Sequence, residues 1–509
     1  MRIAALVMIA SSAFAQPGTV RSAVGVTRDG APIAAILTAE DFQYETKKIR
    51  VLVTGEPGAV TRAAEWFFTD RAAAGLRKRF ALSAVPFAVS GTFPPPGEAY
   101  SSTANPEAMY LWRWIGMHAP DYVVVAGNPG KDEECRRLAC QLGKTAPSNT
   151  GTIPAVEVAP ADGFLAAALK NAPQQPSPAR LEIQKRLKRT PLEVARQLSA
   201  VYGKELPQAV YIPAMALINR MRLGEITKDP SQLAMVEKIV SPYFNGEKNS
   251  LEKASSSHLS GHLVFGELYA RTRKPRYLEL ARAAAGMGFE DGRMKESMPL
   301  HNEMSDSVYM GTPILVQVGK LTGEAKYFDM AMRHMRFMLK LNVRKDGLHR
   351  HSPLDETAWG RGNGFPALGL ALSLSDLPGD HPGRAEMLAA FRAHMEAMLP
   401  HQDPTGMWHQ VVDRPESYRE LTVTAMTAFA MERGLRRGWL DRAKFQKAVD
   451  RAWYALKTRV AADGSLVDVC TNTGKQKSLR DYYDRPAILG VDARGGAMAW
   501  LIANELAAR

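Results

Sequence analysis

The stretch AWGRGNGF, from Ala358 to Phe365, gathers side chains that could bind a flat, anionic ligand. Its three glycines let the backbone take positive φ or pass close to another group. It lies between a polar segment, HRHSPLDET, and an apolar helical run, PALGLALSLSDL, so we predict a tight turn that leads into a helix. The positive end of that helix, the ring of Trp359 and the guanidinium of Arg361 would together suit such a ligand. The alternative is a capped helix with Trp359 in the core and Arg361 as a surface charge.

Other motifs that carry chemistry are missing from the sequence. It has no C-x-x-C pair, no H-E-x-x-H motif and no Walker-type glycine loop. Its three cysteines are too few for a disulfide framework. Cys135 and Cys140 could pair and leave Cys470 free, but we expect all three to be ordinary small residues.

The beginning of the chain, MRIAALVMIASSAFAQ, has the pattern of a secretory signal. Arg2 precedes a short apolar run, and Ala13-Phe14-Ala15 forms an A-x-A cleavage site. The apolar run is too short to span a bilayer, and no later stretch approaches a membrane span. We therefore predict a signal peptide over residues 1–15 and a secreted or periplasmic protein without a membrane span.

The net charge of +13 favours a polyanionic partner. Nucleic acid, acidic lipid and acidic polysaccharide all belong to this class. The positive residues are spread out, apart from QKRLKR near Lys185. Because export argues against nucleic acid, an acidic oligosaccharide is the expected partner.

The mature chain divides into two regions of different pattern. Residues 16–170 are expected to form an α/β domain, because Ile49 to Gly55 and Asp121 to Gly127 are short β-branched runs that end in glycine. Residues 171–191, rich in Pro, Gln and Ser at their start, are predicted to be a linker. Over residues 192–509 we expect roughly eleven or twelve amphipathic helices in pairs, which favours a closed toroid over a solenoid.

Four segments of the helical region resemble one enzyme family. They are SDSVYMGTPILVQVGKLTGEAKYFDMA, LHRHSPLDETAWGRGNGF, GMWHQVVDRPESYRELTVTAMTAFAMERGLRRG and YYDRPAILGVDARGGAMAWLIANE. From about Tyr211 to Glu505, their order and spacing are similar to those of the unsaturated rhamnogalacturonyl and glucuronyl hydrolases, glycoside hydrolase families 105 and 88. The resemblance implies an (α/α)6 barrel that follows the α/β domain.

The resemblance also implies the hydration of a vinyl ether. The substrate would be an oligosaccharide left by a polysaccharide lyase, with a 4,5-unsaturated uronic acid at its non-reducing end. A proton adds to C4 and water to C5, and the hemiketal that results falls apart. One carboxyl can act as acid toward the alkene and as base toward the water, so the two-carboxylate arrangement of ordinary glycosidases does not apply.

The resemblance also implies roles for individual residues of the site. Asp306 matches the catalytic aspartate and His351 the substrate-binding histidine. Trp359 would be a stacking platform and Arg361 a fork for the uronate carboxylate. From the residues alone, Asp306 could instead be a helix N-cap, and His351 a solvated loop histidine.

Two further residues are expected to contact the substrate. Phe365 keeps an aromatic ring where the family often has tryptophan, and Asn302 lies in the segment just before Asp306. We expect no metal ion and no cofactor.

One departure from the family keeps other functions open. The family usually has a second acidic residue before its second helical hairpin, but here the segment reads KASSSHLSGHLVFGELYA, which contains no Asp and has Ser256, Ser257 and His258 in this neighbourhood. This favours an alternative, a non-catalytic glycan-binding protein built on decayed enzyme folds. A weaker option is another (α/α)6 carbohydrate enzyme, such as an epimerase or an inverting hydrolase.

The first region carries a fainter resemblance to the zinc carboxypeptidase superfamily. It rests on VLVTGEPGAVTRAAEWFF, FPPPGEAY and NPEAMYLWRWIGMHAPDYVVVAG. The family's His-x-x-Glu falls on Pro57 to Val60, and its later histidine on Ala126, so both sets of metal ligands are absent. The resemblance implies a metal-free scaffold or glycan-binding module.

Overall fold

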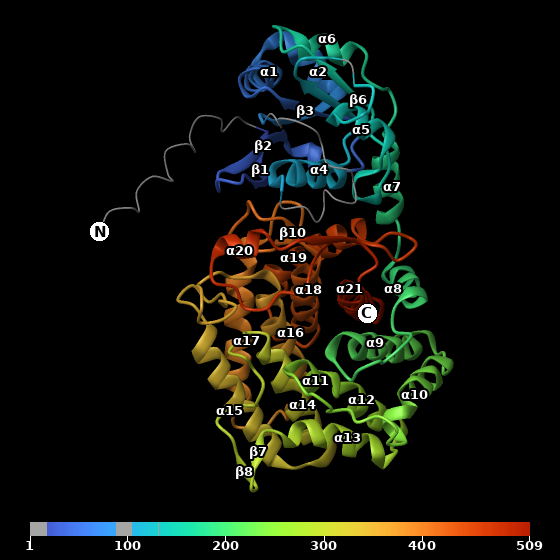
Figure 1. Ribbon diagram of the computed structural model, residues 1–509, viewed down its shortest axis with the longest axis vertical. Coiled ribbons are helices and arrows are strands. Elements are labelled where there is room, and N and C mark those ends of the chain that lie inside the picture. Colours follow the sequence, from blue (N-terminus) through green and yellow to red (C-terminus); the bar gives the residue numbers. More distant parts are fainter. Residues whose placement is uncertain (1–17, 88–103, 131) are drawn as a thin grey trace, which may run out of the picture. The chain divides into compact units, whose positions relative to one another are not determined.

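The computed structural model describes residues 18–87, 104–130 and 132–509. The predicted signal peptide, residues 1–15, lies outside the described residues. The chain divides into two compact units on either side of the bond between Lys185 and Arg186 (Figure 1). In the described part of the chain, no helix has the length and apolar character needed to cross a membrane.

A mixed six-stranded sheet forms the centre of the first unit, in the order β1-β2-β4-β3-β5-β6. The pairs β3–β4, β3–β5 and β5–β6 are parallel, whereas β1–β2 and β2–β4 are antiparallel. This confirms the expected α/β region, and β3 and β5 are the two strands predicted from the sequence. The strands are β1 (Thr19–Val26), β2 (Pro32–Thr38), β3 (Ile49–Gly55), β4 (Phe80–Val85), β5 (Tyr122–Ala126) and β6 (Ala155–Val158), and the helices are α1 (Pro57–Thr69), α2 (Ala74–Arg79), α4 (Pro106–His118), α5 (Leu138–Lys144), α6 (Phe164–Lys170) and α7 (Pro178–Leu187).

Residues 171–185, which the sequence predicted to be part of a linker, pack on this first unit. The buried carboxylate of Asp121 accepts hydrogen bonds from the backbone N–H of Ser177 at 2.9 Å and from Nη1 of Arg180 at 2.5 Å. Arg180 also donates to the carbonyl oxygens of Tyr44 and Lys48. Composition alone could not reveal this, because a buried carboxylate 56 residues away supplies the partner.

A disulfide links Cys135 and Cys140, whose Cα atoms lie 5.3 Å apart. The expectation that all three cysteines are ordinary small residues was therefore wrong for this pair. A separation of five residues allows the chain to turn back within the range that a disulfide spans. Cys470 is free and buried, as that pairing requires.

Six helix pairs form the second unit, and its inner helices make a closed ring. Each inner helix contacts the next, and α21 returns to contact α9, so the predicted toroid is an (α/α)6 barrel. One inner helix is interrupted at His262 and has two parts, α11 and α12. The inner helices are α9 (Tyr211–Thr227), α11 (Ser256–Gly261) with α12 (Leu263–Thr272), α14 (Ser307–Thr322), α16 (Gly360–Asp376), α18 (Leu421–Arg436) and α21 (Ala493–Ala507), and their outer partners are α10 (Ser231–Phe244), α13 (Pro275–Gly286), α15 (Ala325–Asn342), α17 (Arg384–Met398), α19 (Arg442–Thr458) and α8 (Pro191–Val201).

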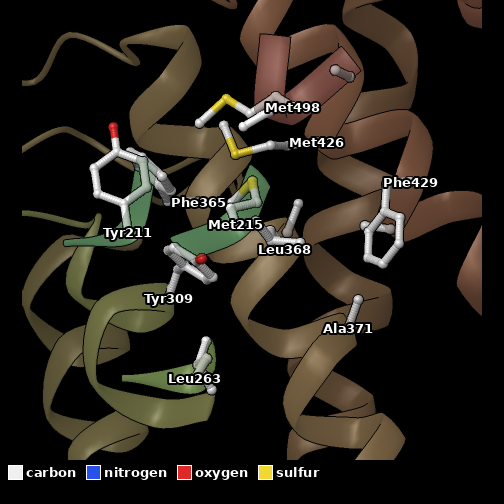
Figure 2. Close-up of a cluster of buried hydrophobic side chains, with 14 of the residues drawn as sticks. Tyr211, Met215, Leu263, Tyr309, Phe365, Leu368, Ala371, Met426, Phe429 and Met498 are labelled. Atoms are coloured by element: carbon white, nitrogen blue, oxygen red, sulfur yellow. The ribbon is translucent and has the colours of Figure 1, made fainter. Parts of the chain in front are cut away.

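The interior of the ring is apolar, with side chains from every inner helix. Helices surrounded by partners must be hydrophobic around most of their circumference, and all residues of α14 from Ser307 to Gly319 are buried. Figure 2 shows how these side chains pack between the inner helices. Those labelled there are Tyr211, Met215, Leu263, Tyr309, Phe365, Leu368, Ala371, Met426, Phe429 and Met498.

The inner helices from α9 to α18 are each followed by an outer helix that returns the chain, so they run in the same direction, and α21 closes the ring between α18 and α9. The residues that precede them therefore gather at one end of the barrel, where the positive ends of six helix dipoles meet. Short elements in the connections add to this end. They are β9 (Trp408–His409), β10 (Arg419–Glu420), β11 (Leu466–Cys470), α20 (Leu479–Tyr483) and β12 (Ala487–Gly490), while β7 (Phe289–Glu290) and β8 (Arg293–Met294) form a hairpin between α13 and α14.

Candidate active site

Asp306 stands directly before α14 and faces His351. The distance from Oδ1 of Asp306 to Nε2 of His351 is 3.5 Å. Asp306 occupies the N-cap position, yet its side chain makes no hydrogen bond to the helix. Its Oδ1 is buried and has no hydrogen-bond partner among the described residues. The side chain of Asp306 therefore does not cap the helix that it precedes.

His351 is fully buried and is held from its other side by Tyr482. Nδ1 of His351 lies 2.9 Å from the hydroxyl oxygen of Tyr482. That hydroxyl also accepts a hydrogen bond from the backbone N–H of Gln476 at 3.3 Å. Burial raises the pKa of Tyr482, so its hydroxyl keeps its proton near neutral pH. The interpretation of His351 as a solvated loop residue was wrong, because its exposed fraction is 0%.

Trp359 forms part of the wall behind His351. It is 1% exposed, its ring centroid lies 4.3 Å from that of His351, and the guanidinium carbon of Arg361 lies 4.6 Å from the indole centroid. These contacts fit the alternative interpretation, in which Trp359 is a core residue. Stacking of Trp359 on a sugar remains a prediction.

Arg361 is buried beside the site and is not a surface charge. Its Nη1 donates to the carbonyl oxygen of Cys470 at 2.8 Å, and its Nη2 to that of Thr471 at 2.7 Å. Burial opposes the charge, but neighbouring acidic groups, with Cys470 the largest contributor among them, raise the pKa of Arg361. The guanidinium is thus a fixed positive charge that also holds the end of β11.

Phe365 and Asn302 occupy different environments. Phe365 is 1% exposed, and its ring stacks on Tyr309 with centroids 5.6 Å apart and contacts Tyr211 edge-on (Figure 2). Asn302 is exposed, on a loop where it, Leu300 and Glu303 all have positive φ. Substrate contacts by Phe365 and Asn302 remain predictions.

Sequence reasoning missed two polar residues that lie close to Asp306 and Arg361. Tyr211 begins α9, and burial raises the pKa of its hydroxyl, which is hydrogen-bonded to Arg494. The charges of Arg361 and Asp306 also act on the pKa of this hydroxyl. Arg494 lies in the first turn of α21, within one of the quoted family segments, but its residue type alone gave no signal.

The start of α11, in the segment where the resemblance led us to expect a second acid, carries a histidine in a capping arrangement. Nδ1 of His258 accepts a hydrogen bond from the backbone N–H of Ser255 at 3.1 Å. Burial lowers the pKa of His258, so it is neutral near neutral pH. This helix adjoins α14, because the Ser260 hydroxyl contacts Sδ of Met310.

Glu420, another buried acid at this end of the barrel, is occupied by structural hydrogen bonds. Its Oε2 accepts from the hydroxyl of Thr422 and the backbone N–H of Val423, and its Oε1 from the backbone N–H of Cys470. In the described part of the chain, no group of three or more His, Cys, Asp or Glu side chains could hold a metal ion. The arrangement therefore offers one available carboxyl, a neighbouring histidine and two arginines, which suits acid–base chemistry on an anionic ligand.

Comparisons with known proteins identify the family of the helical unit. A sequence model of glycosyl hydrolase family 88 matches residues 200–509. An unsaturated 3S-rhamnoglycuronyl hydrolase of Formosa agariphila is 32% identical over 183 residues, which cover 32% of this chain and 48% of that protein. The unsaturated rhamnogalacturonyl hydrolase YesR of Bacillus subtilis is 27% identical over 192 residues, which cover 36% of this chain and 53% of that protein. The chain thus spans about half the length of these curated relatives.

A solved structure shares the fold of the helical unit. A glycoside hydrolase of family 105 from C. acetobutylicum superposes with a TM-score of 0.56 at 22% sequence identity, covering 62% of this chain and 98% of that protein. At this identity, the likeness concerns the fold of the barrel.

Proposed function

The chain belongs to glycosyl hydrolase family 88, and from this premise we propose that it hydrates the 4,5-double bond of an unsaturated uronic acid at the non-reducing end of an oligosaccharide. The single observation that carries the proposal is the position of Asp306. Its carboxyl faces a buried histidine at 3.5 Å and makes no capping bond to the helix that it precedes. A carboxyl held in this way can move a proton to and from a bound substrate.

The proposed reaction needs only one proton carrier. Asp306 gives its proton to C4, so a C–H bond forms there and positive charge develops at C5. Water then attacks C5, and the carboxylate takes one proton from that water. When the hemiketal opens, the C5–O5 bond breaks, a ketone forms at C5 and the ring oxygen becomes a hydroxyl on C1. The hemiacetal at C1 then collapses to an aldehyde, its hydroxyl proton passes to the departing oxygen, and the rest of the oligosaccharide is released. Asp306 is protonated again at the end, so it acts first as an acid and then as a base.

Two arginines are proposed to attract the uronate carboxylate. Each terminal nitrogen of Arg361 uses one N–H for a backbone carbonyl and keeps a second one. Arg494, whose side chain is 11% exposed, lies beside it and donates to the same Cys470 oxygen at 3.2 Å. Their charges add to the positive ends of α16 and α21, which favours an anion at this place.

The proposal is tested by turnover on a panel of lyase products. Loss of the absorbance of the unsaturated uronate would follow if the double bond is hydrated. The panel covers rhamnogalacturonyl and glucuronyl disaccharides, with and without sulfate, because membership of the family does not determine which of these is the substrate. An absence of turnover on every member, together with measurable affinity for one of them, would contradict the proposal.

That second outcome would favour the non-catalytic alternative. Its supporting observation is the start of α11, where Ser255 and His258 form a capping pair and no carboxylate stands. A neutral histidine can hydrogen-bond to a sugar but supplies no fixed negative charge.

We further propose export to the periplasm or the medium. The signal-like residues 1–15 and the Cys135–Cys140 disulfide support this, since disulfides persist in oxidising compartments. Sequencing the N-terminus of the protein isolated from the producing cell is the test. A mature protein that begins at Gln16 is expected, and an intact Met1 in the cytosol would contradict export.

For the first unit we propose a scaffold or glycan-binding module without zinc. The positions of the missing ligands lie together, because Pro57 starts α1 directly after β3 and the backbone N–H of Glu56 donates to the carbonyl oxygen of Ala126. A cavity of about 340 Å³ next to them is lined by Trp66, Arg62 and Asp162, which could stack on and hydrogen-bond to a sugar.

Two binding measurements on the full chain test this role of the first unit. Titration with acidic glycans should show, besides binding at the proposed active site of the helical unit, a second binding event that Trp66→Ala abolishes. Unchanged glycan binding by Trp66→Ala would leave only the scaffold role. Titration with zinc should show no stoichiometric uptake, and stoichiometric zinc binding would contradict the proposal.

A further inference from the structure

A chain of polar contacts leads from the segment before α20 to the carboxyl of Asp306. The backbone N–H of Gln476 donates to the hydroxyl oxygen of Tyr482 at 3.3 Å. That hydroxyl lies 2.9 Å from Nδ1 of His351, and Nε2 of the same ring lies 3.5 Å from Oδ1 of Asp306. Tyr482 and His351 are 1% and 0% exposed, so bulk solvent does not reach these groups.

The chemistry of these groups selects one protonation pattern. A neutral imidazole has one donor and one acceptor nitrogen. If Nδ1 carried the proton, the lone pair of Nε2 would face the lone pairs of Oδ1, the oxygen of Asp306 that bears no hydrogen when the proton of the acid is on Oδ2, which is repulsive. If the hydroxyl of Tyr482 donates to Nδ1, Nε2 carries the proton and points it at Oδ1. The tyrosine oxygen can still accept from Gln476, so the Gln476 N–H and the Tyr482 hydroxyl both have acceptors, while the Nε2–H faces Oδ1 at 3.5 Å.

The position of the tyrosine is itself fixed. Nε2 of Gln410 donates to the carbonyl oxygen of Tyr482 at 2.6 Å. The phenol ring lies 5.8 Å from the ring of His351 and 6.4 Å from that of Trp359, measured between centroids. The hydroxyl therefore has little freedom to turn away from Nδ1.

We propose that Tyr482 is a positioning residue that holds His351 in the tautomer with hydrogen on Nε2. In that tautomer His351 directs its Nε2–H at Oδ1 of Asp306, so Oδ1 is not available to the substrate. Oδ1 is the buried oxygen of the carboxyl, whereas the side chain as a whole is 13% exposed. The oxygen left to exchange a proton with the substrate is Oδ2. The 3.5 Å separation shortens when substrate binds, as catalytic hydrogen bonds do in other enzymes.

The part of this inference that concerns the rate rests on the proposed function, but the tautomer does not. The test therefore measures both. Nitrogen-15 spectra of histidine-labelled full-length protein, with the His351 signals assigned by their loss in His351→Gln, report which ring nitrogen carries hydrogen. We expect hydrogen on Nε2 in the parent protein and a mixture of tautomers in Tyr482→Phe.

The kinetic arm uses Tyr482→Phe beside a matched control, Tyr483→Phe. Tyr483 is the next residue of α20, and its hydroxyl contacts Glu416 at 2.5 Å, outside the chain of contacts to Asp306. We expect kcat of Tyr482→Phe to fall about tenfold, the value of one hydrogen bond, with KM nearly unchanged. Tyr483→Phe should keep the parental kcat and tautomer.

Each outcome decides a different question. Hydrogen on Nδ1 in the parent, or an unchanged tautomer in Tyr482→Phe, would overturn the positioning role, and the parent spectrum decides this even if the variant does not fold. Parental kcat in Tyr482→Phe with a changed tautomer would overturn its link to the rate. If the parent turns over no unsaturated uronide while the tautomers behave as expected, the proposed function fails and the positioning of His351 stands.

Discussion

Arg361 on α16 and Cys470 at the end of β11 are joined by a hydrogen bond of 2.8 Å from Nη1 to the carbonyl oxygen. The residues are 109 positions apart in the sequence, and Nη2 makes a second bond to the following carbonyl, that of Thr471. The planar guanidinium thus fixes the start of the segment that leads to Tyr482. Its shape matters here as much as its charge.

Arg361→Lys should weaken the binding of an unsaturated disaccharide in spite of the conserved charge. A single ammonium cannot replace two divergent N–H donors, so we expect a loss of about 1–3 kcal/mol in binding free energy. Calorimetric titration of the variant in an Asp306→Asn background measures affinity without turnover. Arg480→Lys, which changes a half-exposed pair with Asp484, is the control. Equal affinity of the Arg361 variant and its parent would refute the binding role.

Gly369→Ala should destabilise the barrel. Gly369 lies where α16 meets α14, and a Cβ there would approach the carbonyl oxygen of Val308 to 2.6 Å and Cα of Tyr309 to 2.7 Å. Backbone atoms cannot move aside as a flexible side chain can, so we expect a loss of about 1–3 kcal/mol in the free energy of unfolding. Gly379→Ala, where a Cβ meets open space, should change it little. Chemical denaturation of both variants is the measurement, and equal midpoints would contradict this packing.

The stability of the helical unit should fall with acid because of His334. Its Nδ1 accepts from the backbone N–H of Met298, and its Nε2 donates to the carbonyl oxygen of Ser307, so the neutral ring is fully used. Burial lowers the pKa of His334 from 6.5 to about 4. Below pH 6.5 the imidazole of His334 binds a proton in the unfolded chain but stays neutral in the folded protein. The free energy of unfolding therefore decreases as pH falls toward about 4.

His334→Gln should remove this contribution. Between pH 6.5 and 4, the slope of unfolding free energy against pH should decrease by about 1.4 kcal/mol per pH unit, the value of one proton. Denaturation curves at several pH values give the slope. A slope equal to that of the parent would mean that His334 already titrates normally in the folded protein.

The fold and the position of the site could be predicted from the sequence to different degrees. Long helical patterns predicted the paired helices, and four segments in register predicted the family that the match over residues 200–509 confirms. The roles of Tyr482 and Arg494 could not be predicted from residue type, because each depends on a partner far along the chain. Likewise, the sequence of the Gly-rich turn could not show that Arg361 would be buried and would donate hydrogen bonds to two backbone carbonyl oxygens.

Asp306→Asn tests the central claim most directly. The amide keeps the size of the side chain, and no capping bond is lost, so the thermal midpoint should move by only a few degrees. Asparagine cannot give a proton to C4 or take one from water. On the best substrate of the lyase-product panel, we predict that turnover falls by about 10² or more while substrate affinity changes little. A stable, well-folded Asp306→Asn protein with parental turnover would contradict the account.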